Sequence, residues 1–131
     1  MQPKYHVKLR ILDEEMLPEE ITEQTGISPS KIWYKNDLRP KTCIKEKESG
    51  WELESTLHKE RLLAEHIVFL LSVIEPVYVQ FQNCTQRYYS QLSCAIYFDD
   101  ERPEICFDKN LIIQLADLNL NVDIDIYGIE E

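Results

Sequence analysis

The chain is 131 residues long and 44% hydrophobic, which is enough to fill the core of one domain, and its three glycines and six prolines exclude collagen-like and low-complexity classes. Its 24 acidic and 14 basic residues give a formal net charge of -10, which repels phosphate backbones and anionic lipid surfaces. We therefore expect no nucleic-acid partner and no membrane association, and the charge either provides solubility or forms a docking face for a basic protein partner.

The first predicted elements are a strand and a short helix. Residues 5–12 alternate between apolar and basic side chains, which is typical of a strand with one buried face. In the next segment Pro18 suits the first helical position and Gly26 suits the left-handed residue that ends a helix. Glu19 and Glu20 suit the positive end of the helix dipole, so we interpret these acids as part of a helix start rather than as a binding site.

Residues 28–49 form a long connection, which is the only basic stretch of the chain. A connection of this length in a compact domain is either functional or mobile. The Ile-Trp-Tyr sequence at residues 32–34 predicts a short strand inside it. Residues 50–55 then alternate again and predict a further strand.

Three aromatic residues, Trp33, Tyr34 and Trp51, lie within or beside this connection. Together with its lysines and arginines they are candidates to line a pocket between the 28–49 connection and the sheet. The alternative is that they close the core under a long loop.

The main helix is predicted at residues 59–75, where apolar side chains recur at helical spacing over a wide face. Pro76 then marks a break. Residues 77–86 fit either a strand or a second helix that begins at the proline, and we favour the helix.

A hairpin is predicted after these helices. Residues 89–98 alternate as a strand, the acidic residues Asp99, Asp100 and Glu101 begin the turn, and residues 105–107 form the returning strand. Residues 109–118 follow as a helix, with Asp108 as its N-cap.

The last predicted strand, residues 121–127, has strict period two. Val122, Ile124 and Ile126 point to one side, which we expect to be buried, and Asp123 and Asp125 point to the solvated side. Two carboxylates on one face can act in acid–base chemistry or bind a divalent ion.

A salt ladder is the alternative role of these two carboxylates. If the first and last strands are neighbours, Lys8 and Arg10 face Asp123 and Asp125 across them.

These elements predict one α+β domain over residues 1–131. We expect a single antiparallel-rich sheet with helices packed on one face, in a ferredoxin-like rhythm. The main core is predicted to contain Trp51, Leu53, Leu63, Ile67, Leu70, Leu92, Ile96, Val122, Ile124 and Ile126.

No catalytic or metal-binding constellation is present in the sequence. The closest cysteines are Cys84 and Cys94, and the three histidines are scattered, so zinc-site spacing is absent. The three glycines are too far apart to form a phosphate loop. We expect no catalytic residue and no cofactor. Four unpaired cysteines and an N-terminus without a secretory apolar run predict a cytoplasmic location.

Several of these segments resemble a family that is known mainly from bacteria, domain of unknown function 4279. The matching segments are Leu17-Pro18-Glu19-Glu20-Ile21 with Gly26-Ile27-Ser28-Pro29, Gly50-Trp51-Glu52-Leu53-Glu54-Ser55, Ser93-Cys94-Ala95-Ile96-Tyr97, and Leu118 through Tyr127. The chain departs from the family pattern at Leu17, where a hydroxyl or acidic cap is typical. The resemblance implies a small α+β domain and implies no catalytic residues.

Two classes of function fit these observations. The first is a protein–protein interaction module, such as an immunity-type antidote that masks a basic toxin surface; the fitting acidic residues are Asp99, Asp100, Glu101, Asp123, Asp125 and Glu130. The second is a small-molecule binder or enzyme that uses the aromatic pocket described above. A homodimer built through the sheet is compatible with either.

Overall fold

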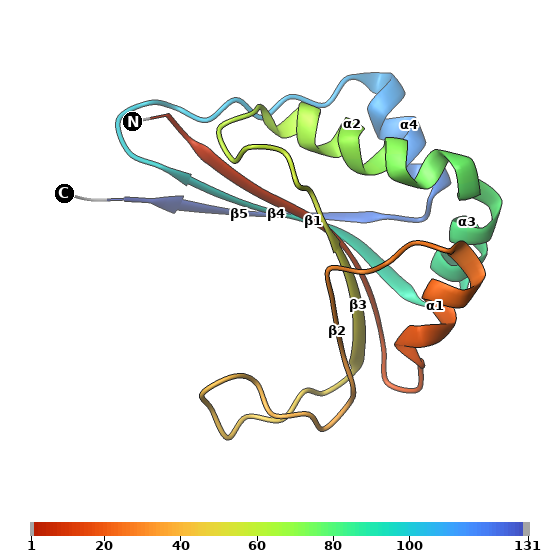
Figure 1. The fold of residues 1–131 in the computed structure, drawn as a ribbon. Coiled ribbons are helices and arrows are strands. Elements are labelled where there is room, and N and C mark those ends of the chain that lie inside the picture. The colour runs from red at the N-terminus through yellow and green to blue at the C-terminus, as the bar shows by residue number, and fades with distance from the viewer. Residues whose placement is uncertain (1, 130–131) are drawn as a thin grey trace.

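Strand β1, Lys4–Asp13, lies at the centre of a five-stranded sheet with the order β2-β3-β1-β4-β5 (Figure 1). The computed structural model describes residues 2–129. The other strands are β2 (Lys31–Trp33), β3 (Ser49–Glu54), β4 (Tyr89–Phe98) and β5 (Asn121–Gly128). Neighbouring strands are antiparallel except β4 and β5, which are parallel. The predicted α+β class with an antiparallel-rich sheet is confirmed.

The helices all lie on one face of this sheet, as Figure 1 shows. They are α1 (Pro18–Thr25), α2 (Leu63–Ile74), α3 (Tyr78–Arg87), which follows a 3₁₀ turn at Glu75–Val77, and α4 (Lys109–Asp117). One hydrophobic cluster contains a buried residue from each, for example Ile21, Ile67, Phe81 and Leu111. The opposite face of the sheet carries no helix from the described residues, and we call it the open face.

The helix starts follow local sequence with one correction. Helix α1 begins at Pro18 without a side-chain cap from Leu17, as expected from that apolar residue, and ends at Gly26 with a φ of 72°. Helix α2 begins at Leu63 rather than at residue 59, so the predicted start was too early. Residues 58–61 form a turn instead, in which the Arg61 N–H donates to the His58 carbonyl (3.0 Å).

The ambiguous segment at residues 77–86 is helical, as we favoured, because Pro76 opens the 3₁₀ turn that leads into α3. By length and composition alone, the stretch Leu63–Arg87 could cross a membrane. In the fold its α2 portion packs on β1, and Leu63, Ile67, Leu70 and Ile74 are fully buried.

The predicted hairpin after β4 is wrong. Residues 105–107 are not a strand; the chain crosses instead through α4 and returns as β5, parallel to β4. A parallel pair needs such a crossover, and the apolar residues of 105–107 produce the same pattern in an extended connection as in a short strand. The predicted N-cap is present, since the Leu111 N–H donates to Asp108 Oδ1 (2.8 Å).

The predicted core is correct for seven of its ten residues and wrong at β5. Val122 and Ile126 are exposed, and Ile124 is only half-buried. The seven that are buried are Trp51, Leu53, Leu63, Ile67, Leu70, Leu92 and Ile96. The alternation of β5 is real, but β5 is an edge strand that the helices do not fully cover.

Candidate functional site

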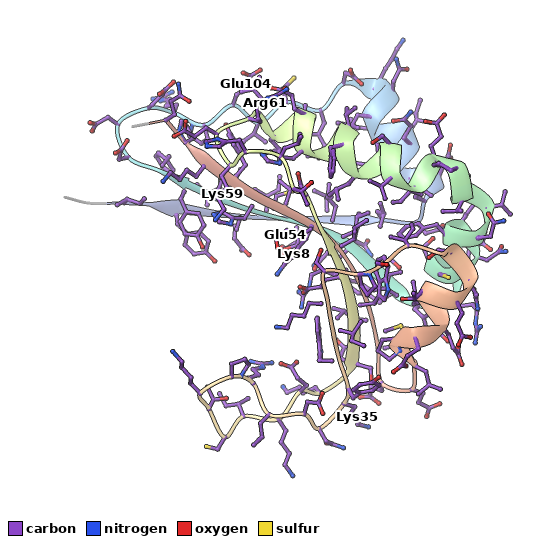
Figure 2. All side chains as sticks on the ribbon, in the orientation of Figure 1. Lys8, Lys35, Glu54, Lys59, Arg61 and Glu104 are labelled. Atoms are coloured by element: carbon purple, nitrogen blue, oxygen red, sulfur yellow. The ribbon has the colours of Figure 1, made fainter. Side chains whose placement is uncertain are left out.

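The open face has basic side chains at its centre and acidic side chains on both flanks. Lys8 of β1 lies opposite Glu54 of β3, and both are labelled in Figure 2. On its other side Lys8 lies opposite Ser93 of β4, which in turn lies opposite Asp123 of β5. The uncharged side chains of β4, such as Ser93 and Ala95, therefore separate the bases of β1 from the acids of β5.

Glu52 of β3 is the acid that pairs with the central bases. Its carboxylate accepts a hydrogen bond from Arg10 Nε at 2.8 Å and lies 3.4 Å from Lys8 Nζ. Glu52 is only 6% exposed, so its carboxylate is sheltered from water, whereas the side chains of Lys8 and Arg10 remain 39% and 29% exposed. The predicted ladder from Lys8 and Arg10 to Asp123 and Asp125 is therefore wrong, because β4 lies between β1 and β5.

Asp123 and Asp125 project from the edge strand into solvent. Both are exposed, and within the part of the chain that the structure describes neither forms an ion pair. At the far end of the strand Tyr127 stacks on Tyr97 with ring centroids 4.9 Å apart, and His6 packs on the other edge of Tyr97. The two carboxylates are thus held on an ordered strand and are available to a partner.

The acidic turn after β4 lies at the same end of the sheet as the end of β5. Phe98 pairs with Gly128, and the Ile129 N–H donates to the Phe98 carbonyl (2.7 Å). Asp99 accepts a hydrogen bond from the Asp100 N–H, and Asp100 and Glu101 are exposed. The sixth predicted acid, Glu130, lies outside the described residues. The parallel pairing therefore places the acidic turn and the end of β5 at the same end of the sheet, with Asp125 and Asp123 farther along β5 opposite Ala95 and Ser93.

The three aromatic candidates do not converge on one pocket. Trp33 lies on the open face across Gly50, where an added Cβ would come within 2.1 Å of its ring. Arg10 and Lys31 lie 5.6 and 5.2 Å from the centre of that ring. Trp51 points to the helix face, packs against Phe81 and is fully buried.

Tyr34 is partly exposed where the chain leaves β2. Its backbone N–H donates to Asp37 at the start of the projecting loop, which extends away from the sheet in Figure 1.

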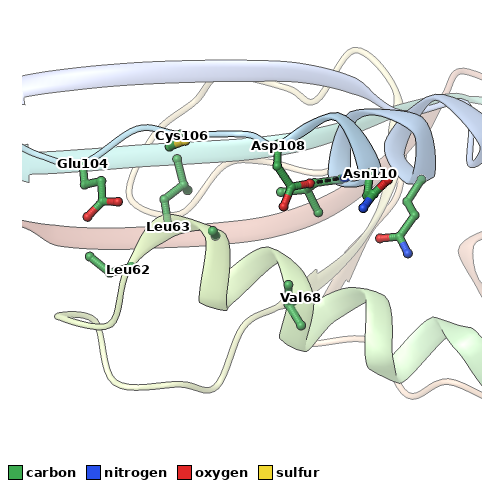
Figure 3. Close-up of a pocket in the computed structure, with 10 residues that line it drawn as sticks. Leu62, Leu63, Val68, Glu104, Cys106, Asp108 and Asn110 are labelled. Carbon is green, nitrogen blue, oxygen red and sulfur yellow. Dashed lines mark hydrogen bonds between the residues drawn. The ribbon is translucent and has the colours of Figure 1, made fainter.

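A groove between α2 and α4 was not predicted from the sequence. Two cavities of about 300 and 310 Å³ share Val68 and Gln114 as lining residues, so they adjoin each other along the outer surface of the helix layer. Leu62, Leu63 and Leu111 supply apolar walls, with Glu104 and Asp108 at the rim (Figure 3). The exposed Val68 on the outer side of α2 was the sequence signal, because it extends the apolar stripe beyond the side that packs on the sheet.

A buried polar pair lies under α2. The Leu57 N–H donates to Ser55 Oγ (3.3 Å), and Ser55 Oγ and His66 Nδ1 share a hydrogen bond (2.7 Å). His66 is 1% exposed, and burial lowers its pKa below the ordinary value. No described residue hydrogen-bonds Nε2, so no carboxylate orients the ring as a hydrolase triad requires. The pair fixes the chain after β3 to α2.

The metal-ligating side chains and the four cysteines were compared with the requirements of metal binding and of thiol chemistry. No group of three or more His, Cys, Asp or Glu side chains within residues 2–129 is placed to hold a metal ion. Burial raises the pKa of Cys94 to about 12 and also raises the pKa of Cys84, so these two thiols are inert. Cys43 and Cys106 are exposed.

The fold and these surfaces define a small α+β domain whose sheet is covered by helices on one face and open on the other. The sequence model of the family described as "Domain of unknown function (DUF4279)" matches residues 3–128, and the chain belongs to this family. Comparison with curated proteins gave no match, and neither did comparison with solved structures.

Proposed function

We propose that this domain is a protein–protein interaction module that docks a basic partner at the β5 edge. The observation that carries the proposal is the contrast between two kinds of acid on the open face. Glu52 is buried and neutralised by Lys8 and Arg10, whereas Asp123 and Asp125 are exposed and unpaired within residues 2–129. Exposed, unpaired carboxylates on a rigid strand lose little hydration until a partner arrives.

The charge around β5 strengthens this proposal. From residue 99 to the end the sequence has ten acids and two bases, Arg102 and Lys109. A field of one sign speeds the association of a partner of opposite sign, and salt screens it within about 10 Å at 0.1 M. An antidote that masks a basic toxin surface is one role that such a domain would serve.

The test compares two charge reversals of equal size. In the first variant Asp123 and Asp125 are both replaced by lysine, and in the control Glu19→Lys and Glu23→Lys alter exposed positions of α1. Binding of a fluorescent oligolysine peptide is measured at low and at physiological salt. We expect the β5 variant to bind about tenfold more weakly than the control, which corresponds to ~1.4 kcal/mol. Equal weakening in both variants would leave the charge with solubility as its only role.

A second candidate function is the binding of a small apolar molecule in the groove between α2 and α4. The observation in its favour is the pair of adjoining cavities, which are at the lower end of the size range of ligand pockets. Fluorescence of anilinonaphthalene sulfonate should rise with the native protein and should fall back with Val68→Glu, which puts a charge between the two cavities. Unchanged fluorescence with that variant would exclude the groove.

A further inference from the structure

The outer edge of β5 has unpaired backbone groups. Among residues 2–129, strand β5 pairs only with β4, and the Ile129 N–H points toward β4, where it donates to the Phe98 carbonyl. Because backbone groups alternate along a strand, the N–H and C=O groups of Val122, Ile124 and Ile126 point away from the sheet.

Strand β5 lacks three protections that sheet edges commonly have, namely shortness, lysine and proline, and the charges that it does have are both acidic. Exposed edges are commonly shortened or carry lysine or proline, and the opposite edge strand β2 is only three residues long and begins with Lys31. Strand β5 has eight residues and contains neither lysine nor proline. It is therefore a template for a further strand.

On the helix side of this edge, apolar side chains of β5 and α4 remain exposed to solvent. Val122 is 42% exposed, and Ile126 on the same side of β5 is 52% exposed. On α4, Asn110 and Gln114 line the groove that faces α2. Ile112, which is 53% exposed, lies on the other flank of α4, because each residue turns about 100° round a helix. Apolar side chains of an added strand would be covered by this flank and by β5.

The open-face side of the same edge selects the charge of the added strand. Asp123 and Asp125 would lie beside every second side chain of a neighbouring strand. A second copy of this chain fits poorly, because antiparallel self-pairing centred on residues 123–125 places one aspartate opposite another. Lysine or arginine at the alternate positions would neutralise both carboxylates.

We propose that β5 receives an extended segment of a partner protein as an additional strand, in which basic residues alternate with apolar ones. Main-chain hydrogen bonds supply affinity in this mode of recognition, and alternate side chains supply specificity. The inference rests on the proposed function and names the conformation and the pattern of the partner. Charge alone would accept a basic partner of any conformation; strand addition requires alternation and free N–H groups.

The probe is a peptide of about ten residues, a normal strand length, in which lysine alternates with valine. The control peptide has the same composition arranged as a lysine block and a valine block. We expect the alternating peptide to bind at least about tenfold more tightly. It should slow hydrogen exchange at the amides of Val122, Ile124 and Ile126. Equal binding of the two peptides, with unchanged exchange at these amides, would overturn the inference.

Two variants separate the backbone contribution from side-chain loss. Ile126→Pro removes an outward N–H and leaves the hydrogen bonds to β4 intact, which edge strands tolerate. Ile126→Thr keeps that N–H and also shortens the apolar side chain. We expect the proline variant to lose at least about tenfold more affinity than the threonine variant. If the proline variant is misfolded by circular dichroism, the exchange measurement on the unaltered protein decides.

The outcomes also distinguish this inference from the proposed function. If reversal of Asp123 and Asp125 abolishes binding while Ile126→Pro binds normally, the acidic surface acts by charge and strand addition is wrong. A concentration-dependent dimer that Ile126→Pro dissolves would mean that a second copy occupies the edge, which contradicts the inference.

Discussion

Strands β4 and β5 are paired in register and have the same alternation, yet they differ in burial. Leu92, Cys94 and Ile96 of β4 lie opposite Val122, Ile124 and Ile126 of β5 on the same side of the sheet. Ile96 is 0% exposed and Ile126 is 52% exposed. The pleat decides which way a side chain points, and the position of the strand in the sheet decides whether anything covers it. Apolar residues with a period of two therefore predict which face of the sheet the side chains occupy. Whether those side chains are buried also depends on the neighbouring strands and helices.

The largest expected effect comes from truncating one isoleucine on each of these strands. Ile96→Ala should lower the free energy of unfolding by about 2–5 kcal/mol, because it leaves a cavity in the core. Ile126→Ala, on the partner position of β5, should lower it by less than about 1 kcal/mol. Urea denaturation of both variants measures the difference. Similar losses would mean that the edge is covered as fully as the inner strand.

Two glycines, one on inner strand β3 and one on edge strand β5, differ in how closely an aromatic side chain lies against them. Gly50→Ala would force Trp33 from its place across β3, since the ring lies 2.1 Å from the new Cβ, and should cost about 1–3 kcal/mol. Gly128→Ala at the end of β5 meets Phe98 at 3.8 Å, an ordinary contact, and should change stability by less than about 1 kcal/mol. Thermal denaturation, monitored by tryptophan fluorescence, measures the stability of both variants. An unchanged stability of the Gly50→Ala variant, with unchanged tryptophan emission, would contradict the packing of Trp33 on Gly50.

The acids of the inner and edge strands give a third comparison. Glu52→Gln should cost about 1–2 kcal/mol, because the sheltered carboxylate receives Arg10 and Lys8. Asp125→Asn should change stability by no more than about 0.5 kcal/mol, since the residue is exposed and forms no ion pair within residues 2–129. If Asp125→Asn proves the more costly change, measured by urea denaturation, the carboxylate has a structural role.

The smallest predicted effect is a pH dependence of the free energy of unfolding, caused by His66 of α2. Burial lowers the pKa of His66 below its ordinary value of 6.5, so the unfolded chain takes up a proton more readily than the folded one. The contribution of His66 is therefore complete above pH 6.5 and decreases as the pH falls below that value. His66→Gln should flatten the stability profile between about pH 5 and 7.5, above the range where most carboxylates titrate.

His6 provides the control for this measurement. Its pKa is also lowered, by burial first and then by Lys59, so His6→Gln should reduce the slope as well, partly because the charge of His6 helps to lower the pKa of His66. A profile that His66→Gln leaves unchanged would mean that the ring is protonated equally in both states.

The sequence predicted individual elements well, because the periods of two and 3.6 are local properties of the chain. The burial of Leu92 and Ile67 and the helix ends at Pro18 and Gly26 follow from such local patterns. Strand order does not follow, since the alternation of β5 fits a place beside β1 as well as one beside β4. The predicted ladder to Asp123 was wrong for this reason.

The candidate sites show the same limit. Trp33 and Trp51 are on different strands separated by a loop, so the side of the sheet that each occupies depends on the register between β2 and β3. The groove between α2 and α4 depends on the spacing of two helices, which neither helix specifies alone. The β4 turn and the end of β5 lie at the same end of the sheet because these two strands are parallel neighbours, and the sequence did not predict that pairing.

The central position of β1 has a consequence for biosynthesis. This strand is synthesised before both of its partners, and one of them is β4, so that Lys4 lies opposite Tyr97. Contacts between segments so far apart in sequence slow folding, since a long loop must close before they stabilise the chain. On the ribosome β1 can pair early with β3 alone, and its apolar face waits for β4 to be synthesised. A nascent chain stalled between these two strands therefore presents Tyr5, Val7 and Leu9 to chaperones, although they are among the most buried residues of the finished domain.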